Sequence, residues 1–147
     1  MHWPLNAKLL AKPGAFVDIG EPITEGLADP HELLSILFRY HSDFDGIYLG
    51  TLRSLNKFQL LLVNAIQGIY QSQGVSISSK HVEVIVRQMT SKVLIKHAGD
   101  TPLLPGELIR LALALEIYKA LILPTGVKPY KVPQYEPLFY QQLSASF

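Results

Sequence analysis

The sequence predicts an α+β fold, in which a helical hairpin over about residues 51–91 packs with a small β element. Apolar residues keep the helical period through the first part of this hairpin. Gly74 and Ser79 then mark a helix end and a new helix start. Two β-prone stretches, 12–24 and 92–110, flank the hairpin, and we expect them to form a barrel-like or hairpin element together.

Composition limits the possible functions. The 147 residues suffice for one core, and the net charge of +1 is no electrostatic footprint for nucleic acid. The chain has no cysteine, which excludes disulfides and thiolate zinc sites within it. An apolar fraction of 48% and a mean hydropathy of +0.21 indicate surface that other polypeptide covers.

The stretch 12–27 has the pattern of a β element interrupted by turns. A biotin or lipoyl carrier would present a lysine at a hairpin tip, and Lys12 is not placed there, so the sequence favours a structural role. Phe16, Val17 and Ile19 are β-prone residues, and Gly14 and Gly20 mark turns. Pro13 and Pro22 lack the amide hydrogen that a strand donates to its neighbour.

The helical part is expected over residues 29–91 and begins with a strong start signal. Asp29 caps the helix, Pro30 fits its first turn, and Glu32 favours the positive end of the helix dipole. His31 has no second ligand at metal-binding spacing, so a structural role is favoured. The apolar side then consists of Leu33, Leu34, Leu37 and Phe38.

The second helix of the hairpin starts near Ser79, which we expect to be its cap. Alternating valines also fit a strand, but the cap signal and the spacing of Glu83 and Arg87, four residues apart, favour a helix with an ion pair. The apolar side is expected to hold Val82, Ile85, Val86, Met89 and Val93, and the opposite side Lys80, Glu83 and Arg87.

After the hairpin we expect a β pair over 92–110, an apolar helix over 111–123 and a proline-rich extended tail over 124–147. The apolar run from 103 to 123 carries four charges, so we expect no membrane span. Tyrosines between lysines in the tail also suit stacking on nucleic acid, but its prolines favour an extended segment on a protein surface.

Several long strings resemble one known family, the β″ subunit of cyanobacterial and plastid DNA-directed RNA polymerase, the C-terminal part of a split subunit. The resemblance covers roughly residues 14–110, in the family's order and spacing. It lies in Glu25-Gly26-Leu27, Asp29-Pro30-His31-Glu32-Leu33-Leu34, Ile69-Tyr70-Gln71-Ser72-Gln73-Gly74-Val75, Lys80-His81-Val82-Glu83-Val84-Ile85-Val86-Arg87-Gln88-Met89-Thr90-Ser91-Lys92-Val93, Gly99-Asp100-Thr101 and Leu103-Leu104-Pro105-Gly106-Glu107-Leu108.

The string Asp43-Phe44-Asp45-Gly46 repeats the middle of the polymerase superfamily's catalytic motif, Asn-Ala-Asp-Phe-Asp-Gly-Asp. Two-metal catalysis needs clustered carboxylates, but here Ile47 replaces the third aspartate. In β″ relatives this position is a connecting loop, and the metal site belongs to β′. We therefore interpret the string as an Asp/Gly turn.

The resemblance implies a structural segment of RNA polymerase, near the jaw and clamp base by downstream DNA, with no catalytic, cofactor or metal residues in this chain. Magnesium and zinc are expected elsewhere in the assembly. The implied partners are the β, β′ and α subunits, with DNA reached through the complex, in a plastid or the cyanobacterial cytoplasm. The expected nucleic-acid-facing residues are Lys80, Arg87 and Lys92.

The family's next block, a glycine-led segment and a Ser/Phe-rich helix, does not follow Leu138. Residues 1–147 are therefore expected to be a single piece of a larger subunit: a fragment, a truncated copy or a copy with a frame-altered end. The alternative is a non-enzymatic helical protein-interaction module.

Overall fold

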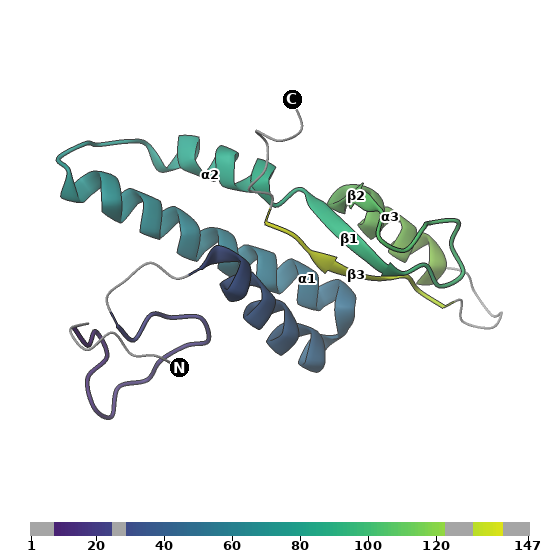
Figure 1. Ribbon diagram of the computed structural model, residues 1–147, viewed down its shortest axis with the longest axis horizontal. Helices are drawn as coiled ribbons and strands as arrows, with labels where there is room; N and C mark the ends of the chain where they lie inside the picture. Colours follow the sequence, from purple (N-terminus) through teal and green to yellow (C-terminus); the bar gives the residue numbers. More distant parts are fainter. Residues whose placement is uncertain (1–7, 25–28, 123–130, 140–147) are drawn as a thin grey trace.

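The computed structural model describes residues 8–24, 29–122 and 131–139 and confirms the α+β class (Figure 1). Two helices are followed by a small antiparallel sheet, and a third helix packs on that sheet. The elements are α1 (Pro30–Ser72), α2 (Ser79–Met89), β1 (Lys92–His97), β2 (Leu108–Arg110), α3 (Leu111–Ile122) and β3 (Gln134–Pro137).

Helix α1 consists of two halves, 30–45 and 47–72, joined at a sharp turn. Gly46 has φ 80° and ψ 173°, a conformation that interrupts the helix and suits glycine. The halves fold back on each other so closely that a Cβ at Gly50 would lie 2.6 Å from the Cα of Ser42 (Figure 1). The Asp/Gly turn predicted from the sequence is therefore present.

The first half of α1 starts as predicted. Asp29 is the N-cap, its Oδ1 accepts a hydrogen bond from the His31 amide at 3.0 Å, and Pro30 occupies the first turn. Leu34 and Leu37 then pack on the second half of α1.

Gly74 ends α1 as predicted, with φ 75°. The amide of Val75 donates to the carbonyl of Tyr70 at 3.0 Å, and that of Gly74 to Gln71 at 3.0 Å, which is the pattern of a glycine-terminated helix end. The predicted cap of α2 was wrong by one residue. Ser78 occupies the cap position without a side-chain hydrogen bond, and Ser79 is the first helical residue.

The buried side of α2 is narrower than predicted. Val82 and Val86, four residues apart, face α1, whereas Ile85 is 59% exposed. A short helix that packs against one neighbour buries a narrow stripe, and Ile85 lies outside it.

The sheet has the order β2-β1-β3 and is antiparallel throughout. Val93 pairs with Ile109 on β2 and with Pro137 on β3, so the tail supplies a strand. Pro137 is tolerated because β3 lies at an edge. The other segments of the tail, 124–130 and 140–147, are outside the described residues.

The predicted β contribution of residues 12–24 was wrong. The described N-terminal segment holds one isolated bridge, Leu9 to Thr24, and no strand that pairs with β1. Gly14 and Gly20 take φ of 80° and 81°, which breaks the segment into turns, and its prolines lack ladder donors. The string Glu25-Gly26-Leu27 lies outside the described residues.

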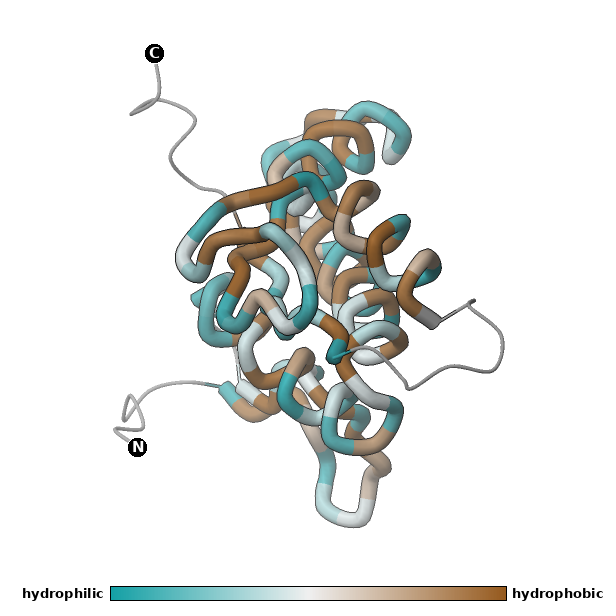
Figure 2. The backbone as a smooth tube through the Cα atoms, turned by 90° about the vertical axis from the view of Figure 1, so that its right-hand side faces the viewer, coloured by the Kyte–Doolittle hydropathy of each residue, from teal (hydrophilic) through white to brown (hydrophobic). Residues whose placement is uncertain are grey.

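Three apolar clusters hold the elements together, and Figure 2 shows apolar positions alternating with polar ones around the helical turns. The first joins the two halves of α1, the second joins the sheet to α3, and the third joins α1 to α2. The buried residues of the first cluster are Leu34, Leu37, Leu55, Phe58 and Phe139. Those of the second are Val93, Ile95, Ile109, Ala114 and Tyr135, and those of the third are Val63, Val82 and Val86.

Candidate functional site

The three basic residues predicted to face nucleic acid are all exposed, but they belong to two different elements. Lys80 and Arg87 lie on α2, seven residues apart and therefore on the same side of the helix. Lys92 is the first residue of β1. The structure thus places two of the residues on one helical face with Glu83 between them, and the third on the sheet.

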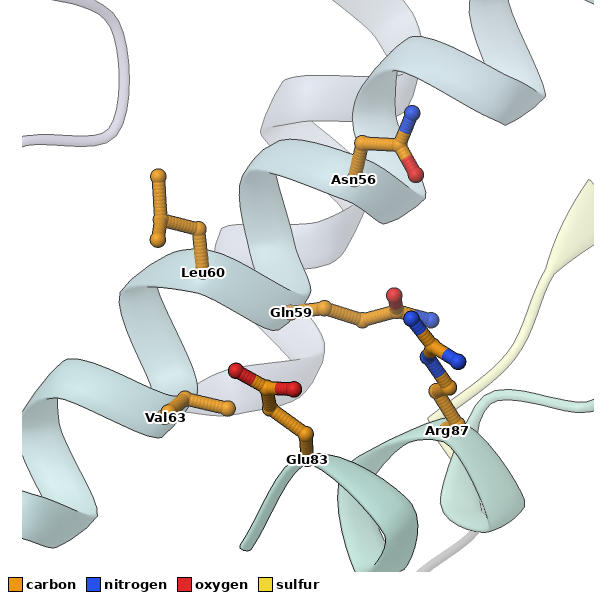
Figure 3. Close-up of a pocket in the computed structure, with 6 residues that line it drawn as sticks. All are labelled: Asn56, Gln59, Leu60, Val63, Glu83 and Arg87. Carbon is orange, nitrogen blue, oxygen red and sulfur yellow. The ribbon is translucent and has the colours of Figure 1, made fainter. Parts of the chain in front are cut away.

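A groove of about 200 Å³ runs between α1 and α2 (Figure 3). Its two walls are helical ridges, because the α1 residues are spaced at i, i+3, i+4 and i+7 and the α2 residues at i and i+4. The lining residues are Asn56, Gln59, Leu60 and Val63 from α1, and Glu83 and Arg87 from α2.

Polar groups of both helices meet at this groove. Gln59 Nε2 donates a hydrogen bond to Thr90 Oγ1 at 2.8 Å, which holds the glutamine side chain at the end of α2. The carboxylate of Glu83 and the guanidinium of Arg87 project from α2 toward α1 (Figure 3). The predicted Glu83–Arg87 ion pair is not among the ion pairs of the described chain.

A second basic position lies on the sheet. Lys92 of β1 pairs directly with Arg110 of β2, and both side chains are exposed. Directly opposite residues have Cβ atoms about 4.5–5.5 Å apart, and like charges at this spacing destabilise the pairing. The neighbouring Val93 and Ile109 point the other way, into the core, so the two cations share the outer face. Sequence reasoning missed Arg110, although it ends the predicted β pair.

The aspartates of the Asp-Phe-Asp-Gly string do not gather into a metal centre. Asp45 Oδ2 accepts from Arg53 Nη1 at 2.7 Å, and Asp43 is exposed at the end of the first half of α1. In the described ranges no three His, Cys, Asp or Glu side chains come together where they could hold a metal ion. His31 lies instead edge-on to the ring of Phe139, with centroids 5.4 Å apart.

One buried polar group stands out beneath the sheet. Tyr135 on β3 is 2% exposed, and its hydroxyl has no partner with hydrogen-bond geometry among the described residues, although the side chain of Thr51 lies beside it. Burial raises the pKa of Tyr135 to about 12. Nearby, the rings of Tyr48 and Tyr118 stack with centroids 4.4 Å apart, which ties α1 to α3. This cluster is a packing element that joins three parts of the fold.

Comparison with known proteins assigns the family. Residues 39–131, which include the α1–α2 groove and the Lys92–Arg110 pair, match the family model of RNA polymerase Rpb1, domain 5. The chain belongs to the RNA polymerase Rpb1 domain 5 family. No helix in the described part of this domain 5 segment has the length and apolar character needed to cross a membrane.

Two curated relatives are both described as DNA-directed RNA polymerase subunit beta″. The protein of Rhodomonas salina is 45% identical over 120 residues, which is 82% of this chain and 9% of the relative. The protein of Cyanidium caldarium is 48% identical over 118 residues, 80% of this chain and 9% of the relative. This domain 5 segment therefore spans about a tenth of the length of the relatives it matches.

Proposed function

We propose that this chain is a structural segment of a β″-type subunit of DNA-directed RNA polymerase and serves DNA-templated RNA synthesis without catalytic residues of its own. The match to Rpb1 domain 5 over residues 39–131 carries this proposal. The catalytic Mg²⁺ and the Zn²⁺ of the assembly would lie on other chains. The presence of Ile47 where the catalytic motif has its third aspartate supports this role.

The proposed partners are the β, β′ and α subunits. Large apolar side chains remain exposed on the N-terminal segment, on both halves of α1, on α2 and in the loop between β1 and β2, as expected of surfaces that contact other protein. An assembly would cover them. They include Leu9, Phe16, Phe44, Leu60, Val84, Ile85 and Leu104.

For the DNA side, near the jaw and clamp base, we propose Lys92 together with Arg110, and Lys80 as a further contact. Two exposed cations side by side on the outer face of the sheet provide the charge and the N–H donors that bind a phosphate oxygen. Arg87 is a weaker candidate, because the carboxylate of Glu83 lines the same groove and would repel a phosphate.

The salt dependence of DNA retention tests these contacts in a polymerase assembled with this chain. Each lost phosphate contact reduces the slope of log K against log salt by about 0.9. We expect this reduction for Lys92→Ala and Arg110→Ala and an unchanged slope for Arg87→Ala. Lys119→Ala on α3 is the matched control. An unchanged slope in Lys92→Ala and Arg110→Ala would remove the sheet from the DNA interface.

Co-purification tests the assembly itself and separates it from the alternative function. A β″ segment associates with β and β′, whereas a free-standing helical interaction module, which the α1–α2 hairpin would also suit, stays monodisperse without them. We further propose a plastid or the cyanobacterial cytoplasm as the location, which subcellular fractionation with an antibody to the chain would test.

A further inference from the structure

We propose that the groove between α1 and α2 receives an α-helix of another polymerase subunit. That helix would place one apolar side chain against Val63 and the rim residue Leu60, and a basic and an acidic residue, four positions apart, opposite Glu83 and Arg87. This inference rests on the proposed assembly and assigns a kind of partner to one surface of the chain.

The size of the groove favours a side chain over a small molecule. Its volume of about 200 Å³ is below the range of about 300–1,000 Å³ typical of ligand pockets. Val63 is buried and forms an apolar wall, whereas Leu60 is 56% exposed at the rim (Figure 3). One aliphatic side chain inserted here would cover Leu60.

The groove also has the geometry that helix packing requires. Its α1 wall, Asn56 to Val63, is a continuous i, i+3, i+4, i+7 row, and its α2 wall is an i, i+4 row. Rows of this kind accept the ridge of another helix. The hydrogen bond from Gln59 to Thr90 fixes the end of the groove before any partner arrives, which reduces the ordering cost of binding.

Charge selects the partner. Neither Glu83 nor Arg87 has a side-chain hydrogen bond or ion pair among the described residues, and their spacing along α2 is about 6 Å. A helix with a Lys or Arg and an Asp or Glu four positions apart has the same rise and the complementary charges. Such pairs contribute mainly orientation and selectivity, and the apolar anchor contributes affinity.

Photocrosslinking in the assembled complex tests the inference. The full chain carrying benzoylphenylalanine at position 60 is co-expressed with β, β′ and α, purified and irradiated, and the crosslinked peptide is sequenced by mass spectrometry. We expect a helical segment of one of these subunits, with opposite charges four positions apart beside the crosslinked residue.

A charge exchange gives the matched comparison. Glu83→Arg with Arg87→Glu keeps the net charge but places a residue of the same sign opposite each charged residue of the partner helix. The double variant should therefore lower the crosslink yield at least about fivefold. The control exchange, Glu116→Lys with Lys119→Glu on exposed α3 positions, should leave the yield within about twofold.

Four outcomes would overturn the inference. Normal co-purification without a crosslink from position 60, a crosslink to a second copy of this chain, or a crosslink to DNA would each refute the helix partner and leave the assembly proposal standing. Failure of the unmodified chain to co-purify with β and β′ would refute the assembly proposal itself, and the helix partner with it.

Discussion

Gln59 in the middle of α1 donates a hydrogen bond to the hydroxyl of Thr90, the residue that ends α2, at 2.8 Å. Thr90 is 1% exposed, and its hydroxyl also donates to the carbonyl of Val86 at 3.0 Å. This hydrogen bond is a polar link between α1 and α2. The apolar contact between the same two helices is made by Val63, Val82 and Val86.

Replacing Gln59 by Ala should lower the free energy of unfolding of the chain by about 1 kcal/mol, because Thr90 loses a buried donor. Urea unfolding measures this change. Gln88→Ala, on the exposed side of α2, removes a similar side chain without a bond and should stay within about 0.5 kcal/mol. Equal effects of the two substitutions would show that the bond contributes nothing to stability.

A second prediction concerns Gly50, where the two halves of α1 that are joined at Gly46 come close together. A Cβ there would lie 2.6 Å from Ser42 Cα, so Gly50→Ala must push the halves of α1 apart and should cost about 1–3 kcal/mol. Gly68 is helical and exposed with nothing within 4 Å, so Gly68→Ala should stabilise by about 0.5–1 kcal/mol. Thermal unfolding of both variants provides the comparison, and shifts of the same sign would contradict it.

The buried hydroxyl of Tyr135 makes a third prediction. It has no partner with hydrogen-bond geometry among the described residues, so Tyr135→Phe should keep or raise the free energy of unfolding, by up to about 1 kcal/mol. Tyr135→Ala should cost about 3–5 kcal/mol, because it leaves a cavity under the sheet. Urea unfolding at neutral pH measures both. A large loss in the Phe variant would reveal a bond to the hydroxyl.

The same residue predicts a response to alkali. The pKa of Tyr135 is raised from 10.0 to about 12, so the folded state keeps a proton that the unfolded state has lost. The contribution of Tyr135 to the free energy of unfolding is therefore fully present below about pH 10, and it is lost as the pH rises from 10 toward 12. Tyr135→Phe should lack this component, and the difference between the two stability curves isolates it from the other tyrosines and lysines. Parallel curves would contradict the raised pKa.

The N-terminal segment is held to α1 by an ion pair that can be titrated. Lys57 Nζ lies 2.7 Å from Asp18 Oδ2, and this hydrogen bond lowers the pKa of Asp18 below its ordinary 3.8. The pair thus stabilises above the ordinary value and is lost as the pH falls through the lowered one. In an NMR titration, Lys57→Met should raise the pKa of Asp18 toward 3.8, and Lys12→Met should not.

Local signals in the sequence predicted the helices well. Asp29-Pro30 and Gly74 determine helix ends through hydrogen bonds to residues within five positions, so their neighbours in sequence suffice. The sheet was predicted less well because β1 pairs with β3 across the whole of α3, and no local pattern specifies that partner. Residues 12–24 have β-prone side chains, but the glycines and prolines among them cause the backbone to turn instead of forming a strand.

The candidate surfaces were only partly predictable for the same reason. Helical periodicity placed Lys80, Glu83 and Arg87 opposite the apolar side of α2, whereas Glu83 and Arg87 line the groove that faces α1. The opposing wall on α1 depends on how the two helices pack, which periodicity does not specify. Arg110 faces Lys92 through strand register, and register depends on turn geometry that the sequence leaves open.

The strand order has a consequence for synthesis of the protein on the ribosome. The turn at Gly46 brings together residues close in sequence, so the two halves of α1 can associate as soon as both have emerged. The central strand β1 must wait for Gln134–Pro137, and until then one of its edges is open while α3 is still being made. We therefore expect nascent chains that stop before Gln134 to be the species most in need of chaperones.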